Sequence, residues 1–215
     1  MRQVRAGESG RLGEATEWSV LWPPARGEVT PGNDASVVLE TRSGLLHDPD
    51  SPDSRDSGDS RDSGDSGDSG DISDSRDSRD SRDSSDGRGT AVLSAVFLGD
   101  LGEDAQNRLR RTRRVPADVD VVKVAHHGSK DQSTLLYERL GATLGLVSVG
   151  ENDYGHPTAS ILETLERVGT TVRRTDREGI IAVGLSPGVG SSGDSARAPL
   201  EVWASGGASD VAGGD

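Results

Sequence analysis

Cysteine is absent from the 215 residues of the sequence. Structural disulfides and cysteine-ligated zinc sites are therefore excluded, and a metal ion would need ligands from His, Asp, Glu or Asn, which suit zinc, manganese or magnesium. Long apolar runs are missing too: no stretch approaches the roughly 18 apolar residues of a membrane-spanning helix. The polar segment 1–16 has no apolar region typical of a secretory signal. The sequence leaves the cellular compartment open.

Aromatic residues make up only 3% of the chain, and none lies between Asp48 and Asp86, a stretch built almost entirely of Asp, Ser, Arg and Gly. Such a composition cannot bury enough apolar surface to offset the entropy of ordering, so we expect a disordered low-complexity insertion at 47–89. Calcium binding by the repeated carboxylates is the alternative, but EF-hand-like loops need a bidentate Glu, which the stretch lacks.

The net charge of −13 comes mainly from this stretch, whose 14 Asp and 5 Arg give −9 and leave −4 for the rest. The part of the chain that can fold is therefore nearly balanced in charge. Its one local basic cluster is Arg108–Arg114, so no broad basic surface indicates nucleic-acid binding.

Outside the insertion, short apolar runs alternate with helical patterns. Strands are predicted at 18–22, 36–41, 91–98, 119–125, 143–149, 172–175 and 180–185, with a short one at 200–203. Helices are predicted at 101–114, 134–140 (capped by Ser133) and 157–168, and a turn at 176–179. This alternation predicts an α/β fold with a largely parallel sheet over 91–185. Strands 36–41 and 91–98 can pair as a hairpin that carries the insertion at its turn.

Polar clusters follow three successive strands. Asp100 ends the first, His126-His127-Gly128-Ser129 ends the second, and Asn152-Asp-Tyr154-Gly-His156 follows the third. Ligands of open α/β sheets bind at the carboxyl ends of the strands, so these side chains are expected to converge there. A carboxylate with neutral imidazoles suits zinc or manganese.

Each piece also has a plainer interpretation. Asp100 can be a helix cap, His126 and His127 a chance surface pair, and His156 a cap before Pro157. Lys130 can add positive charge to the site or be a solvated loop residue. The joint placement of the acid and the three imidazoles after consecutive strands favours a site.

Beside the site, Ser129 can donate to an anionic oxygen. Asn152 and Tyr154 can donate to a substrate or only shape their loop.

These motifs resemble the metallo-β-lactamase-like domain of the ComEC family of DNA-uptake competence proteins. The resemblance covers about residues 16–185 without the insertion. It is carried by Leu21-Trp-Pro-Pro24, Asn33-Asp-Ala-Ser-Val-Val-Leu39, Phe97-Leu-Gly-Asp100, Asp120-Val-Val-Lys-Val-Ala-His126-His-Gly-Ser129, Val147-Ser-Val-Gly150 and Tyr154-Gly-His-Pro157.

The resemblance implies an αββα sandwich with a two-metal site of zinc or manganese and hydrolysis of a phosphodiester, with DNA as the implied substrate. Asp100 would bridge the metals, one of His126 and His127 would be a ligand (His127 is favoured), and His156 would contact the substrate phosphate. Asn33 would approach from the other sheet. The membrane-embedded remainder of a competence channel is the implied partner.

One family feature is missing. The His-x-(His or Asp)-x-Asp-His motif that supplies most ligands of the first metal is absent, and its nearest approach is His47-Asp-Pro-Asp50. We therefore expect the C-terminal half of such a domain, from a misassigned start or a gene fragment, with strands at 1–46, the main part at 90–186 and a Gly/Ser/Ala-rich tail at 187–215.

Two consequences are expected of that loss: poor binding of two metals and an apolar sheet face left uncovered. A non-catalytic remnant, a weak metal or nucleic-acid binder, and a hydrolase of small phosphoesters are the alternatives.

Overall fold

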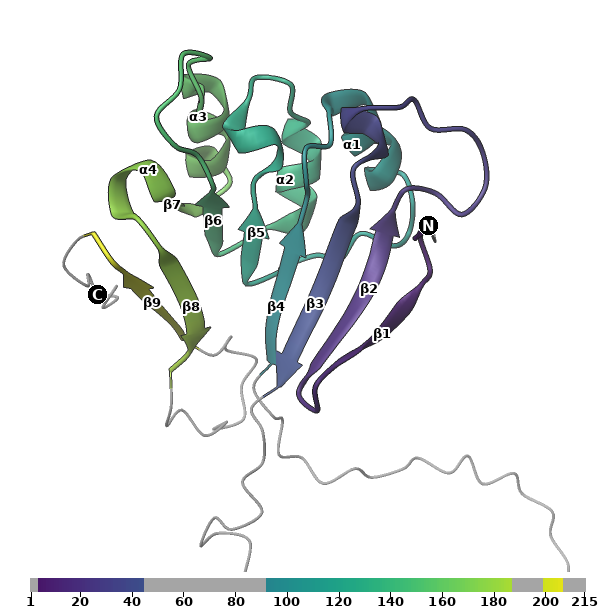
Figure 1. Cartoon of the computed structure of the whole chain (residues 1–215), viewed down its shortest axis with the longest axis horizontal. Coiled ribbons are helices and arrows are strands. Elements are labelled where there is room, and N and C mark those ends of the chain that lie inside the picture. The colour runs from purple at the N-terminus through teal and green to yellow at the C-terminus, as the bar shows by residue number, and fades with distance from the viewer. Residues whose placement is uncertain (1–3, 45–91, 187–198, 207–215) are drawn as a thin grey trace, which may run out of the picture. The chain divides into compact units, whose positions relative to one another are not determined.

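The computed structural model describes residues 4–44, 92–186 and 199–206. These residues form a seven-stranded sheet in the order β1-β2-β3-β4-β5-β6-β7, a separate two-stranded sheet β8-β9, and four α-helices (Figure 1). The predicted insertion at 47–89 and most of the predicted tail lie outside the described residues. Within the described part, no helix is long and apolar enough to cross a membrane.

The first half of the large sheet is antiparallel. It comprises β1 (Ser9–Leu12), β2 (Thr16–Trp22), β3 (Val38–Gly44) and β4 (Val92–Phe97). The predicted hairpin is confirmed, since Leu39 pairs with Phe97 and Gly44 with Val92 across β3 and β4. Strand β1 was not predicted, because its sequence Ser-Gly-Arg-Leu has one apolar residue and its strand conformation depends on pairing with β2.

The second half of the sheet is parallel, as predicted. Strand β4 is followed by β5 (Val121–Lys123), β6 (Leu144–Val147) and β7 (Thr171–Arg174), each paired in parallel with the preceding one. The connections contain α1 (Glu103–Arg110), α2 (Thr134–Leu140) and α3 (Ala159–Arg167). All four carboxyl ends therefore lie at one edge of the sheet.

Side chains alternate between two apolar layers because successive strand residues point to opposite faces. Val96 and Val122 belong to the main core, which also contains buried residues of α1, α2 and α3 such as Leu109, Leu136 and Leu165. Their neighbours Ala95 and Val121 point the other way and pack with residues of β8 (Ile181–Leu185) and β9 (Leu200–Ala204). The helices thus cover one face and the β8-β9 hairpin covers part of the other.

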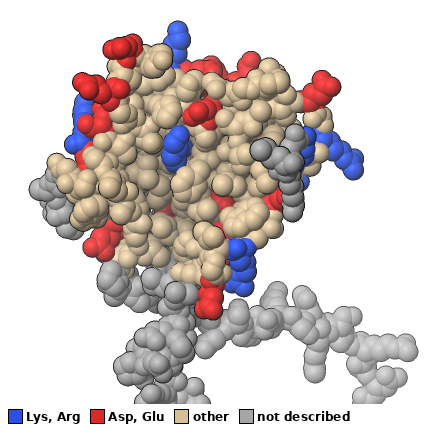
Figure 2. Space-filling model, viewed as in Figure 1, with Lys and Arg blue, Asp and Glu red and all other residues tan. Residues whose placement is uncertain are grey.

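The hairpin leaves the second face open over the antiparallel strands. Leu12, Thr16, Trp18, Val20, Leu39 and Thr41 share this face by register and, with Val4 and Val37, line a cavity of about 370 Å³. Leu12 is 72% exposed and Phe97, which pairs with Leu39, is 41% exposed. We call this surface, made of Leu12, Trp18, Val37, Leu39 and Phe97, the open apolar face. In the view of Figure 2, uncharged side chains dominate the middle and most charged ones lie near the margins.

Several predicted boundaries are corrected. The helix predicted at 101–114 ends at Arg110, because the backbone and hydroxyl of Thr112 both donate to Leu109 O and close the chain into a turn. Ser133 does not cap α2; its hydroxyl donates to Asn107 Oδ1 instead. The turn predicted at 176–179 is a single-turn helix, α4 (Thr175–Glu178).

The helix predicted from Pro157 begins two residues later, at Ala159. The strand predicted at 119–125 is confined to Val121–Lys123, because the chain then enters a tight 3-10 turn, η3 (Ala125–Gly128).

Candidate functional site

The polar clusters predicted at the strand ends do lie at one edge of the sheet. Asp100 follows β4, His126 and His127 lie in η3 after β5, and His156 follows β6. The His126 ring centroid lies 6.4 Å from that of His127 and 5.8 Å from that of His156. The structure therefore brings the acid and three imidazoles of the prediction together.

Asp100 is held through its backbone, and its side chain remains 46% exposed. Its N–H donates to Ser36 Oγ at 3.2 Å, and Lys123 Nζ donates to the preceding carbonyl, Gly99 O, at 3.3 Å. Burial lowers the pKa of Lys123, and the nearby Asp100 carboxylate opposes that shift. The carboxylate is thus presented to solvent from a fixed turn next to a half-buried ammonium group.

The two adjacent histidines adopt left-handed backbone conformations, with φ of 44° at His126 and 53° at His127. Such conformations are uncommon for residues with a Cβ. Here His126 N donates to Gly99 O and Ser129 N donates to His126 O. Gly128 completes the turn with φ of 79°, and a Cβ there would lie 2.6 Å from Pro157 Cβ. The turn presents the two imidazoles at an interplanar angle of 64°.

His127 faces Asp100. Its Nε2 lies 4.0 Å from Asp100 Oδ1, and its Nδ1 lies 2.6 Å from Ser148 O. A carbonyl oxygen can only accept, so Nδ1 carries the proton of this hydrogen bond. In the neutral ring Nε2 then presents a lone pair on the side of the carboxylate. This is the arrangement of a metal-ligating histidine oriented by an outer carbonyl.

In His126, unlike His127, the ring nitrogen Nδ1 accepts a hydrogen bond. Its Nδ1 lies 3.3 Å from Asn33 Nδ2, which is a donor, so Nδ1 accepts. Nε2 of the neutral ring therefore carries the proton and offers no lone pair. Asn33 reaches His126 from η1 (Asn33–Ala35), the turn before β3, and so lies at the same edge.

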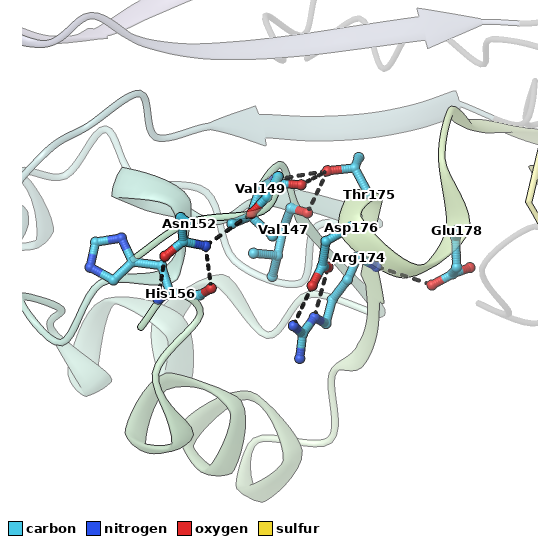
Figure 3. A network of polar contacts seen from close by, with 9 residues as sticks. Val147, Val149, Asn152, His156, Arg174, Thr175, Asp176 and Glu178 are labelled. Carbon is cyan, nitrogen blue, oxygen red and sulfur yellow. Dashed lines mark hydrogen bonds and ion pairs between the residues drawn. The ribbon is translucent and has the colours of Figure 1, made fainter. Parts of the chain in front are cut away.

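His156 lies on a loop that Asn152 holds together, as Figure 3 shows. Asn152 Oδ1 accepts from His156 N at 3.0 Å and Tyr154 N at 3.1 Å, while Nδ2 donates to His156 O and Gly150 O, both at 2.9 Å. Desolvation, followed by the nearby His126 and His127, lowers the pKa of the His156 imidazole. Tyr154 is 85% exposed, with its ring 6.1 Å from that of His156.

The predicted substrate-binding residues divide into two groups. Asn33 and Tyr154 have contacts with the histidines, whereas the side chain of Asn152 is engaged with its own loop. Ser129 is buried, and its hydroxyl accepts from Asp131 N and Gln132 Nε2. Lys130 is exposed.

The donor set matches a metal ion only in part. Asp100 Oδ1 and His127 Nε2 are close enough to share one ion, since zinc binds oxygen and nitrogen ligands at about 2.0–2.2 Å each. Across residues 4–44, 92–186 and 199–206, however, no group of three or more His, Cys, Asp or Glu side chains is arranged to hold a metal. The described residues therefore fit as a ligand pair, fewer than the three protein ligands of a catalytic zinc site.

Four groups at this edge were not predicted from the sequence: Ser148 O, Lys123, Ser36 and Thr175, whose hydroxyl accepts from Val149 N at 2.8 Å. A backbone carbonyl has no sequence signal. Lys123 interrupts an apolar strand pattern shortly before the two histidines, and this position could have indicated that its side chain lies near the site. Thr175 was predicted only as the last residue of a strand.

Part of the chain is similar in sequence to a known protein. The chain is 33% identical over 95 residues to ComE operon protein 3 of Bacillus subtilis (strain 168), an alignment that covers 43% of this chain and 12% of that protein. The aligned part thus spans about an eighth of the length of the relative. No protein-family model matches the chain, and no solved structure matches it.

Proposed function

We propose that this chain carries part of the hydrolytic site of a metal-dependent phosphodiesterase of the metallo-β-lactamase type, associated with competence and DNA uptake. The observation that carries the proposal is the Asp100–His127 pair, in which Nε2 and Oδ1 are 4.0 Å apart and Nδ1 is oriented by Ser148 O. The similarity to ComE operon protein 3 supports the association with competence. A helical layer, a mixed sheet and a hairpin on its second face are consistent with a partial αββα sandwich.

Zinc or manganese bound there would lower the pKa of a water ligand and polarise a phosphoryl oxygen. The chain's own residues would hold the ion and contact the substrate. Asp100 and His127 are the residues that would hold the ion, Asp100 through its carboxylate and His127 through Nε2. His126 is the weaker candidate, because its Nδ1 accepts from Asn33 and its Nε2 is protonated.

His156 is the proposed contact to the substrate phosphate. Its lowered pKa favours the neutral ring at pH 7, which donates one hydrogen bond. Asn33 and Tyr154 lie where they can contact a bound phosphodiester. Asn152 acts on the substrate only through the loop that presents His156, and Ser129 only through the turn that carries the two adjacent histidines.

The proposed substrate is DNA or another phosphodiester, and the proposed partner is the membrane-embedded remainder of a competence channel. A non-catalytic remnant that binds metal or nucleic acid weakly is the second candidate. It is favoured by the lack of a third ligand among the described residues and of the His-x-(His or Asp)-x-Asp-His motif in the sequence.

Manganese-stimulated cleavage of single-stranded DNA and of bis(p-nitrophenyl) phosphate tests the proposal. The chain by itself is expected to cleave neither. A fusion that places the residues preceding the aligned segment of ComE operon protein 3 ahead of this chain is expected to cleave DNA. Asp100→Asn should abolish that activity, and Asp104→Asn, on the solvent side of α1, should retain it. A folded, manganese-loaded fusion that cleaves neither substrate favours the remnant.

A further inference from the structure

The peptide group between Ser148 and Val149 connects His127 to the next strand. Its carbonyl, Ser148 O, accepts from His127 Nδ1 at 2.6 Å. Its amide, Val149 N, donates to Thr175 Oγ1 at 2.8 Å. The two groups belong to one planar unit in which C=O and N–H point in opposite directions. Whatever fixes the amide therefore also fixes the direction of the carbonyl.

Thr175 holds this unit from both sides of Val149. Its hydroxyl accepts from Val149 N and donates to Val149 O at 2.6 Å, with Val147 O a more distant acceptor at 3.5 Å (Figure 3). Thr175 is the first residue of α4 and directly follows β7, which pairs with β6 in parallel. The segment Val147–Val149 leaves the end of β6, so the hydroxyl restrains the backbone at the point where strand pairing stops.

Hydrogen bonds and ion pairs of the neighbouring residues hold Thr175 in place. Arg174, next to Thr175, donates to Asp176 through Nε at 3.0 Å and Nη2 at 2.6 Å, and its backbone N–H donates to Glu178 Oε1 at 3.0 Å. Arg173 Nε lies 3.1 Å from Glu178 Oε2. These contacts fold residues 173–178 onto one another and give the Thr175 hydroxyl a fixed position.

We propose that Thr175 is a positioning residue that sets the tautomer and direction of the His127 imidazole through the Ser148–Val149 peptide. Without the hydroxyl, the peptide loses the partner of its N–H and is free to rotate, and Ser148 O then no longer selects the Nδ1–H form. The lone pair on Nε2, which faces Asp100, depends on that selection. The consequence for metal binding rests on the proposed function, whereas the effect on the ring does not.

The test compares Thr175→Val, which keeps the shape of the side chain but removes the hydroxyl, with Thr175→Ser, which keeps the hydroxyl. Long-range ¹H–¹⁵N spectra of the histidine rings in the metal-free full chain report the tautomer of His127. We expect the Nδ1–H form in the wild type and in Thr175→Ser, and a shift toward a mixture with the Nε2–H form in Thr175→Val. Zinc affinity should fall by about 10-fold or more in Thr175→Val only, as for other outer partners of a ligand.

Two results would overturn the inference: a folded Thr175→Val with the wild-type His127 tautomer, or a Val149 amide in the wild type that exchanges as fast as that of Gly150. The amide-exchange measurement needs no variant, so it can still overturn the inference if Thr175→Val does not fold. If the tautomer responds to Thr175 but zinc binds nowhere near His127, the positioning role stands and the proposed metal site fails.

Discussion

His126 and His127 are neighbours in sequence but differ in the chemistry of their rings. One accepts at Nδ1 from an amide and the other donates from Nδ1 to a carbonyl. This difference originates in the left-handed turn, which directs the imidazoles toward different partners. The adjacent pair could be singled out from the sequence, but the distinction between its members could not, because Asn33 and Ser148 are distant along the chain.

The His156 imidazole offers a residue-scale test of how close the three rings lie. Its pKa is expected below the ordinary value of 6.5 because of desolvation and the neighbouring His126 and His127. His126→Gln removes one of these causes, so the pKa of His156 should rise in that variant. Titration of the ring proton shifts by NMR measures both values. An unchanged pKa in His126→Gln would mean that the rings do not interact.

Asn152 offers a second residue-scale test. Asn152→Ala removes four hydrogen bonds that close the loop around His156, so the His156 amide should exchange faster with solvent. Unfolding free energy should fall by about 1 kcal/mol, a net value for hydrogen bonds that are partly exposed to water. Glu163→Ala, at an exposed position of α3, is the control outside the loop. If the His156 amide exchanges as slowly in Asn152→Ala as in the wild type, the loop is held by other contacts.

At the scale of elements, the parallel pair β4-β5 is secured where β5 begins. Asp120 Oδ2 accepts from both Ser94 N and Ser94 Oγ at 2.7 Å, and Asp120 N donates back to Ser94 Oγ at 3.0 Å. Asp120 is buried, so this exchange of hydrogen bonds fixes how β4 and β5 align. Asp100 and the histidines lie at the other end of the same two strands.

Replacing Asp120 by Ala is therefore expected to destabilise the protein by about 2 kcal/mol, because it leaves two half-buried donors of Ser94 without their charged acceptor. Ser94→Ala should cost less, about 1 kcal/mol, since the backbone bond from Ser94 N to Asp120 survives. Urea denaturation gives both values. If Asp120→Ala lowered the free energy of unfolding by less than about 0.5 kcal/mol, the hydrogen bonds between Asp120 and Ser94 would contribute little to stability.

Elements with a strong apolar pattern were predicted well, and those that depend on tertiary partners were not. Helix α2 matches its predicted bounds, because apolar spacing and a terminal left-handed Gly141 define it locally. Strand β1 and helix α4 have no such pattern and depend on pairing with β2 and on the ion pairs of Arg173 and Arg174. Strand β5 is shorter than predicted because the histidine turn begins at Ala125.

At the scale of the whole molecule, the open apolar face is a part of the large sheet that the β8-β9 hairpin leaves uncovered. The helices cover the opposite face of the sheet, and the β8-β9 hairpin covers only the part over β4–β6. Large exposed apolar patches mark interaction surfaces or association hazards. The sequence predicted such a face through the resemblance to a two-sheet fold, but which residues line it follows only from the register of β1–β4.

We therefore expect the chain to self-associate in a concentration-dependent way. Leu12→Lys should weaken this association by placing a charge on the open apolar face, whereas Leu135→Lys, on the solvent side of α2 and 49% exposed in the wild type, should not. Sedimentation velocity over a concentration series measures the effect. A chain that stays monomeric at all concentrations, or one equally affected by both variants, contradicts this expectation.

In the proposed site, Asp100 and His127 together bind a divalent cation at the carboxyl ends of β4 and β5. Its most direct test is a zinc titration of the full chain, followed by the ring ¹⁵N signals of the three histidines at this edge. We expect the His127 Nε2 signal to shift at the lowest zinc concentrations, and we expect Asp100→Asn to weaken this response while Asp104→Asn leaves it intact. A zinc response confined to His126 and His156, or one indifferent to Asp100→Asn, would contradict it.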